Sequence, residues 1–226
     1  MSFFDHVVKV LPLLLEGLKL SVIITVASAV LGIVIGLFVG LGRISKKKPI
    51  KFLAGCYVNF LRGTPLLVQL LIIYAGLPQI LQLITGRPSP MSPIVAAIAA
   101  CSLNSGAYVA EIIRAGIQSI DKGQLEAARS LGLTKKQSMA RVVLPQAFMR
   151  IIPPLGNELI TLLKETSILS AIGLEEMMRK GQLYVASTFQ PFPVYITVAF
   201  IYFIIVVIIS KALSLLERRL RISAES

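Results

Sequence analysis

The sequence is poor in the residues from which most enzyme sites are built. It has one histidine, His6, two aspartates, Asp5 and Asp121, and two cysteines, Cys56 and Cys101. It contains no HExxH motif and no CxxC pair, so nothing in it resembles a metal site. We read both cysteines as inert packing thiols. We therefore expect no catalytic residue, no metal site and no cofactor on this chain. A membrane-embedded enzyme is the alternative, and turnover by the purified chain alone would support it.

Charge is also scarce, and its scarcity argues against a soluble domain. Only 15% of the residues are charged and 55% are hydrophobic, with a mean hydropathy of +0.81. This composition lies outside the range of soluble globular domains and predicts a protein that needs lipid. The phosphate-binding pattern G-x-x-x-x-G-K-[ST] is absent as well. Hydrolysis of ATP by this chain is therefore not expected.

The formal net charge of +12 would suggest nucleic-acid binding in a soluble protein. Here the basic residues gather in three places, Arg43–Lys51, Lys122–Arg141 and Arg218–Arg221, whereas the alternate loops hold few, such as Arg87. This alternation is typical of cytoplasmic loops in a multi-spanning membrane protein. We expect membrane lipid, and no nucleic acid, among the partners.

Long apolar runs predict an all-α integral membrane protein with about five transmembrane helices, because a bilayer core takes roughly 20 apolar residues per helix. The first run continues unbroken to Leu41 behind a poorly basic start, so it is a retained span and not a signal peptide. Five spans place Met1 outside and Ser226 in the cytoplasm. We expect one permease domain over 1–226, with spans near 18–41, 65–84, 93–117, 148–172 and 194–216.

Glycines recur at every fourth residue in the first span, at Gly32, Gly36 and Gly40. They share one helix face and permit close approach of another backbone. That neighbour is either a helix of the same chain or a second subunit, and the sequence does not choose between them.

Polar residues at membrane depth are costly and usually face a protein interior or an aqueous cavity. Pro153, Pro154 and Gly156 precede Glu158, and we expect them to break the helix near mid-membrane, as in many transporter sites. Glu158 suits a substrate ammonium group, although an internal ion pair with Arg62 or Lys164 is an equal alternative. For the third-span residues Asn104, Ser105 and Gly106, helix–helix hydrogen bonding is the alternative to substrate binding. The candidate substrate-binding residues are Glu158, Asn104, Ser105, Gly106, Leu155, Gln69 and Tyr74.

A polar loop at 121–145 is too long for a turn and has a helical composition. Gln124–Leu131 predicts a short helix that Gly132 ends in a left-handed cap. Thr134 with Gln137 fits a capping box that starts a second helix, and we expect Pro145 to close it. The result is a cytoplasmic helix-turn-helix.

This loop also carries a resemblance. Glu126, Ala127, Ala128 and Gly132, followed by Leu144 and Pro145, resemble the EAA loop of ATP-binding-cassette (ABC) importer permeases, with Val142 where that pattern has isoleucine. Two further stretches, Phe60–Leu67 and Asn104–Glu111, resemble the polar amino-acid branch of these permeases. The similarity covers nearly the whole chain.

The resemblance implies a type I ABC importer permease of the bacterial inner membrane. Its partners would be an ATPase dimer that binds ATP and Mg²⁺, a second permease subunit, identical or homologous, and an extracytoplasmic amino-acid-binding protein. Glu126–Gly132 would be the coupling element that docks in the ATPase. The cargo would be a polar amino acid, for which Glu158 favours arginine, histidine or lysine, with glutamine or glutamate as the alternative. A passive channel is the remaining rival, but a channel needs no ATPase dock.

Overall fold

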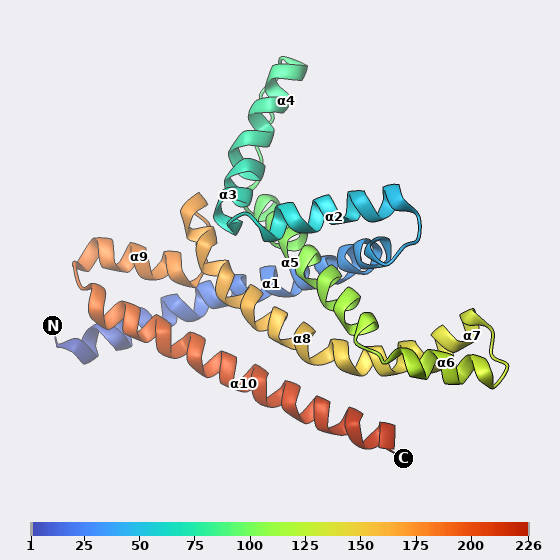
Figure 1. Ribbon diagram of the computed structural model, residues 1–226. Coiled ribbons are helices and arrows are strands. Elements are labelled where there is room, and N and C mark those ends of the chain that lie inside the picture. Colours follow the sequence, from blue (N-terminus) through green and yellow to red (C-terminus); the bar gives the residue numbers. More distant parts are fainter. Residues whose placement is uncertain (1, 226) are drawn as a thin grey trace.

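The computed structural model describes residues 2–225, with side-chain burial given for residues 2–218. Within that range the chain is helical and has no strand. Long helices cross one another in a bundle, and one helical arm projects from it (Figure 1). The elements in order are α1 (Phe3–Arg43), α2 (Lys48–Arg62), α3 (Leu66–Leu71), the π-helical η1 (Ile72–Gly76), α4 (Leu77–Thr85), α5 (Pro93–Gln118), α6 (Lys122–Ser130), α7 (Lys135–Ser138), the π-helical η2 (Met139–Val143), α8 (Leu144–Glu165), the 3₁₀-helical η3 (Thr166–Ile172), α9 (Met177–Thr188) and α10 (Pro191–Glu225).

The predicted all-helical membrane fold is confirmed. Four segments of the described residues are long and apolar enough to span a bilayer, at Phe3–Arg43, Leu66–Thr85, Pro93–Gln118 and Pro191–Arg218. The predicted span at 148–172 is helical in α8 and η3 but is not among these four. Arg150, Glu158 and Lys164 in α8 explain the difference, because charged groups lower the hydropathy of a span. The single domain over 1–226 stays a prediction.

The glycine stripe of α1 packs against α5 of the same chain. A β-carbon at Gly32 would lie 3.1 Å from the Ser105 β-carbon, and one at Gly40 would lie 3.1 Å from the Ala110 carbonyl oxygen. These contacts are closer than side chains normally permit, so the glycines let α1 and α5 approach one another. The structure thus selects the intramolecular alternative for this stripe.

Helix α8 differs from the expected broken helix. Pro153 and Pro154 both lie inside α8, which remains helical through them and through Gly156. Gly156 serves packing, because a β-carbon there would lie 2.6 Å from a methyl group of Leu213 on α10. The expected break at mid-helix was therefore wrong.

Pro145 does not close a helix either. Helix α7 continues through η2 into α8, and Pro145 occupies the first turn of α8. The Leu144 N–H bonds to the Met139 carbonyl five residues earlier. Pro145 has no N–H to donate, and this wider π-helical turn accommodates it. The chain therefore remains helical from α7 into α8.

Helix α9 starts on a buried carboxylate. The Glu176 side chain accepts the backbone N–H groups of Met178 at 2.8 Å and of Arg179 at 2.7 Å, and the residue is fully buried. A β-carbon at Gly17 of α1 would lie 2.8 Å from the backbone of Met177. Gly17 therefore lets the start of α9 press onto α1, where Glu176 is buried. Cys101 is buried as expected, but Cys56 is exposed.

Candidate functional site

The predicted coupling element, Glu126–Gly132, consists of the second half of α6 and the cap that ends it, and a short α6–α7 turn (131–134) follows. The Asp121 carboxylate caps α6 by accepting the Gly123 N–H, and Gly132 ends the helix with a φ of +83°. The Leu133 N–H bonds to the Ala128 carbonyl at 3.2 Å and the Gly132 N–H to the Arg129 carbonyl at 3.0 Å. Both bonds belong to a Schellman cap, which satisfies the carbonyls at the end of a helix.

The start of α7 also has the predicted structure. Thr134 and Gln137 form the predicted capping box, since each side chain bonds to the backbone N–H of the other residue. Gln146 of α8 donates to the Gln124 side chain of α6 at 3.3 Å. This hydrogen bond connects α6 to α8, the helix through which a movement of α6 would reach the membrane.

Exposure divides the coupling residues into two groups. Glu126 and Ala127 are exposed on α6, whereas Ala128 is 4% exposed and faces the turn's own interior. Leu144 and Pro145 are exposed at the start of α8. Leu131 lies within the predicted element Glu126–Gly132 but was not singled out, and its side chain is 85% exposed at the tip of the turn. A large apolar residue directly before the capping glycine was the available signal.

Glu158 lies in a largely apolar cavity of about 350 Å³ between α1, α5, α8 and α10. Ser105 and Leu155, both candidates from the sequence, line the same cavity. Within residues 2–218, no basic group forms an ion pair with Glu158. A carboxylate without an ion-pair partner inside a membrane protein marks a candidate functional site.

The two suggested internal partners of Glu158 are used differently. The Arg62 guanidinium lies over the Tyr108 ring, 5.1 Å from its centroid, which is a cation–π geometry. Lys164 is exposed. The internal-pair alternative for Glu158 is therefore not realised here.

Gln69 and Asn104 bond to one another. The Asn104 amide donates to the Gln69 carbonyl oxygen at 3.0 Å, and the Gln69 amide donates to the backbone carbonyls of Leu61 at 2.8 Å and Thr64 at 3.0 Å. Both side chains are buried. This network closes the turn between α2 and α3 against α5, which is the helix–helix bonding weighed for Asn104.

The other two sequence candidates also lie away from the Glu158 cavity. Gly106 is buried, and a β-carbon there would lie 2.8 Å from the Ile35 side chain. Tyr74 lies in η1, partly buried against the core cluster around Leu70. The substrate contacts assigned to Gly106, Tyr74, Gln69 and Asn104 stay predictions.

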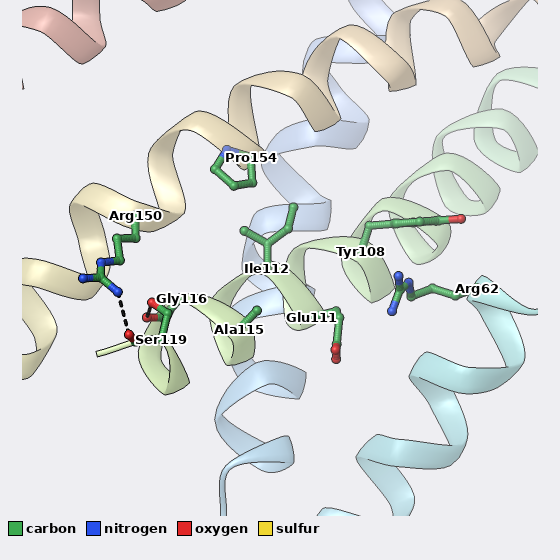
Figure 2. A pocket seen from close by; sticks show the side chains of 9 residues that line it. All are labelled: Arg62, Tyr108, Glu111, Ile112, Ala115, Gly116, Ser119, Arg150 and Pro154. Carbon is green, nitrogen blue, oxygen red and sulfur yellow. Dashed lines mark hydrogen bonds between the residues drawn. The ribbon is translucent and has the colours of Figure 1, made fainter. Parts of the chain in front are cut away.

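A second cavity of about 440 Å³ was not predicted (Figure 2). Arg62 and Tyr108 lie on one side of it, and Arg150 lies on the other, bonded to the Ser119 carbonyl. Glu111 lines it as well and pairs with Arg114, and with Arg43 at 3.6 Å. These charged groups come from α2, α5 and α8, so no local sequence pattern brings them together. Within the described residues, no cluster of three metal-ligating side chains occurs.

Comparison with known proteins agrees with this architecture. Residues 32–222 match the family described as binding-protein-dependent transport system inner membrane component. The arginine transport system permease protein ArtQ of Bacillus subtilis (strain 168) is 42% identical over 96% of this chain and 97% of its own length. A putative glutamine transport system permease protein GlnP of Rickettsia bellii (strain RML369-C) is 37% identical over 97% of this chain and 100% of its own length.

A solved structure extends the match to three dimensions. The crystal structure of an amino acid ABC transporter with histidines superposes with a TM-score of 0.89 at 45% identity, covering 97% of this chain and 99% of that one. The helical bundle, the membrane spans and the sequence relatives point to one family. The chain belongs to the binding-protein-dependent transport system inner membrane components, as a permease of an amino-acid ABC importer.

Proposed function

We propose that this chain forms the translocation pathway for basic amino acids, with Glu158 receiving the cationic side chain. The unpaired Glu158 carboxylate in its apolar cavity carries this proposal. In low-dielectric surroundings a carboxylate attracts a guanidinium, imidazolium or ammonium group far more strongly than in water. The similarity to an arginine permease supports arginine as the first cargo to test.

Glutamine or glutamate is the second candidate, because the chain is also similar to a putative glutamine permease. For glutamine, the Glu158 carboxylate would accept hydrogen bonds from the side-chain amide, and for glutamate it would repel the side-chain carboxylate, so neither cargo needs the negative charge of Glu158. The two candidates thus differ in how transport responds to removal of that charge.

The energy would come from a separate ATPase dimer with ATP and Mg²⁺. Glu126, Ala127 and Leu131 form an exposed rim on the α6–α7 turn, which suits a cleft on that partner. A second permease subunit, identical or homologous, would complete the pathway, and an extracytoplasmic binding protein would deliver the amino acid.

We also propose that the N-terminus lies outside and the C-terminus in the cytoplasm of a bacterial inner membrane. The α1–α2 turn, α6, α7 and the C-terminal end of α10 gather at one end of the molecule, away from the N-terminus and α9 (Figure 1). This arrangement puts the three basic clusters at one end, as the positive-inside rule requires. Met1 and Ser226 themselves lie outside the described residues.

The test is ATP-dependent uptake of labelled arginine and glutamine by proteoliposomes that hold the chain, its ATPase and its binding protein. Glu158→Gln is compared with Glu165→Gln, which removes a carboxylate from the same helix outside the cavity. We expect Glu158→Gln to lower arginine uptake at least about tenfold, as loss of a desolvated charge partner does, and to spare glutamine uptake. Equal uptake of both amino acids in wild type and Glu158→Gln would overturn the assignment of Glu158.

A further inference from the structure

A third cavity lies between the end of α1 and α2, and Glu158 is not among its lining residues. Its volume is about 480 Å³, and it is lined by Arg43, Lys48, Lys51, Phe52, Gly55, Cys56 and Asn59. Three of these residues are cationic and none is acidic. A concave site with this lining attracts an anion.

Within the described range, two of the three cations of this cavity lack an acidic partner that would neutralise them. Among the side chains that the structure describes, Lys48 and Lys51 form no ion pair. Arg43 reaches Glu111 at 3.6 Å, but Glu111 is shared with Arg114. The Arg43 Nε atom is buried and has no hydrogen-bond partner. A buried donor without an acceptor is uncommon, and an anion bound in this cavity would supply one.

Gly55 makes room for this arrangement. A β-carbon at Gly55 would lie 2.9 Å from a terminal nitrogen of the Arg43 guanidinium. Because Gly55 has no side chain, the Arg43 side chain can extend from α1 across α2 and line the cavity. Helix α2 begins beside it without a side-chain cap on its first N–H groups, and such free N–H groups favour an anion.

The surroundings of the cavity are both basic and apolar. Lys46 lies next to Lys135 of α7, and its ammonium lowers the pKa of Lys135, so positive potential extends beyond the cavity. On α2 itself Phe52 is 70% exposed and Leu53 is 67% exposed. Helix α2 thus presents a basic first turn next to apolar side chains, as interfacial helices do.

We propose that this cavity binds the phosphate headgroup of an anionic phospholipid, with Arg43, Lys48 and Lys51 around the phosphate and the acyl chains along the apolar side of α2. A free phosphate ion would satisfy the same cations, but it would leave Phe52 and Leu53 exposed to water. The apolar rim therefore favours a lipid. This site is independent of the amino-acid pathway.

The experiment measures retention of phosphatidylglycerol by the full-length chain in detergent, using native mass spectrometry, with phosphatidylcholine as the neutral comparison. We expect wild type to retain phosphatidylglycerol preferentially and the Lys48→Gln/Lys51→Gln variant to bind it roughly 30-fold more weakly, at about a factor of five per lysine. The matched control is Lys122→Gln/Lys136→Gln, which removes two exposed cations from α6 and α7 and should retain the lipid like wild type.

Two further readouts separate the sources of the anion. Exposed Cys56 lines the cavity, whereas Cys101 is buried, so bound phosphatidylglycerol should slow maleimide labelling at Cys56 alone. Inorganic phosphate in excess should neither displace the lipid nor protect Cys56. Equal retention of both lipids, unchanged retention in the cavity variant, or displacement by phosphate would each overturn the proposal.

Discussion

Gly36 of α1 lies so close to Val109 of α5 that a β-carbon at position 36 would sit 2.5 Å from the Val109 side chain and 2.9 Å from the Gly106 carbonyl oxygen. Gly36→Ala therefore forces α1 away from α5. We expect a loss of roughly 1–3 kcal/mol in stability, the usual effect of overpacking a filled interface. The measurement is the temperature at which the detergent-solubilised protein stops eluting as a single species.

The matched control for this change is Gly76→Ala. Gly76 has an ordinary helical backbone, and the nearest atom to a β-carbon there is 3.9 Å away. We expect no loss of stability from this substitution. A Gly36→Ala protein as stable as Gly76→Ala would show that the two helices are not in close contact in the membrane.

The hydrogen bond between Asn104 and Gln69 gives a second prediction. Gln69→Leu removes the donor to Leu61 and Thr64 and leaves the Asn104 amide with only the longer bond to the Leu61 carbonyl, at 3.5 Å. We expect each single leucine variant to lose stability, and a double-mutant cycle with Asn104→Leu to give a coupling of about 0.5–2 kcal/mol, the range of such bonds within membranes.

This cycle also tests the substrate role predicted for the two residues. If they only close the turn between α2 and α3, folded variants should transport with an unchanged KM for the amino acid. A raised KM at unchanged stability would instead place Asn104 and Gln69 against the cargo.

Features that depend on residues close together in the sequence were predicted, whereas features that depend on distant residues were missed. Apolar runs and helix caps depend on residues within a few positions, and the structure has four of the five expected spans together with the Gly132 and Thr134 caps. The burial of Glu176 was missed because it depends on Gly17, which is distant in the sequence. The continuous passage from α7 into α8 was missed as well, because a π-helical turn at Met139–Val143 joins the two helices just before Pro145.

Glu176 predicts a pH dependence of stability. Burial raises the pKa of Glu176 to about 7, against an ordinary value of 4.5, although the N–H groups of Met178 and Arg179 oppose the shift. The folded state thus holds the proton more tightly than the unfolded state. This contribution to stability is fully present below pH 4.5 and is lost as the pH rises through 7. Its full size is about 3 kcal/mol.

The corresponding measurement is the melting temperature of wild type and Glu176→Gln between pH 5 and pH 8, because glutamine keeps the volume but does not titrate. We expect the melting temperature of wild type to fall over this range relative to that of the variant. Glu175→Gln is the control, since the Glu175 carboxylate is exposed and its pKa is lowered by Lys180. Parallel curves for wild type and Glu176→Gln would contradict the raised pKa.

The coupling turn gives the last prediction. Gly132 holds a φ of +83°, which proline cannot adopt because its ring fixes φ near −65°. Gly132→Pro should therefore displace the exposed Leu131 and Glu126 while the spans still insert. We expect ATP-driven uptake to fall to background at unchanged protein level in the membrane. Gly76→Ala is the conservative comparison, since Gly76 has no positive φ and the nearest atom to a β-carbon there is 3.9 Å away. Normal uptake by Gly132→Pro would mean that the α6–α7 turn does not couple ATP hydrolysis to transport.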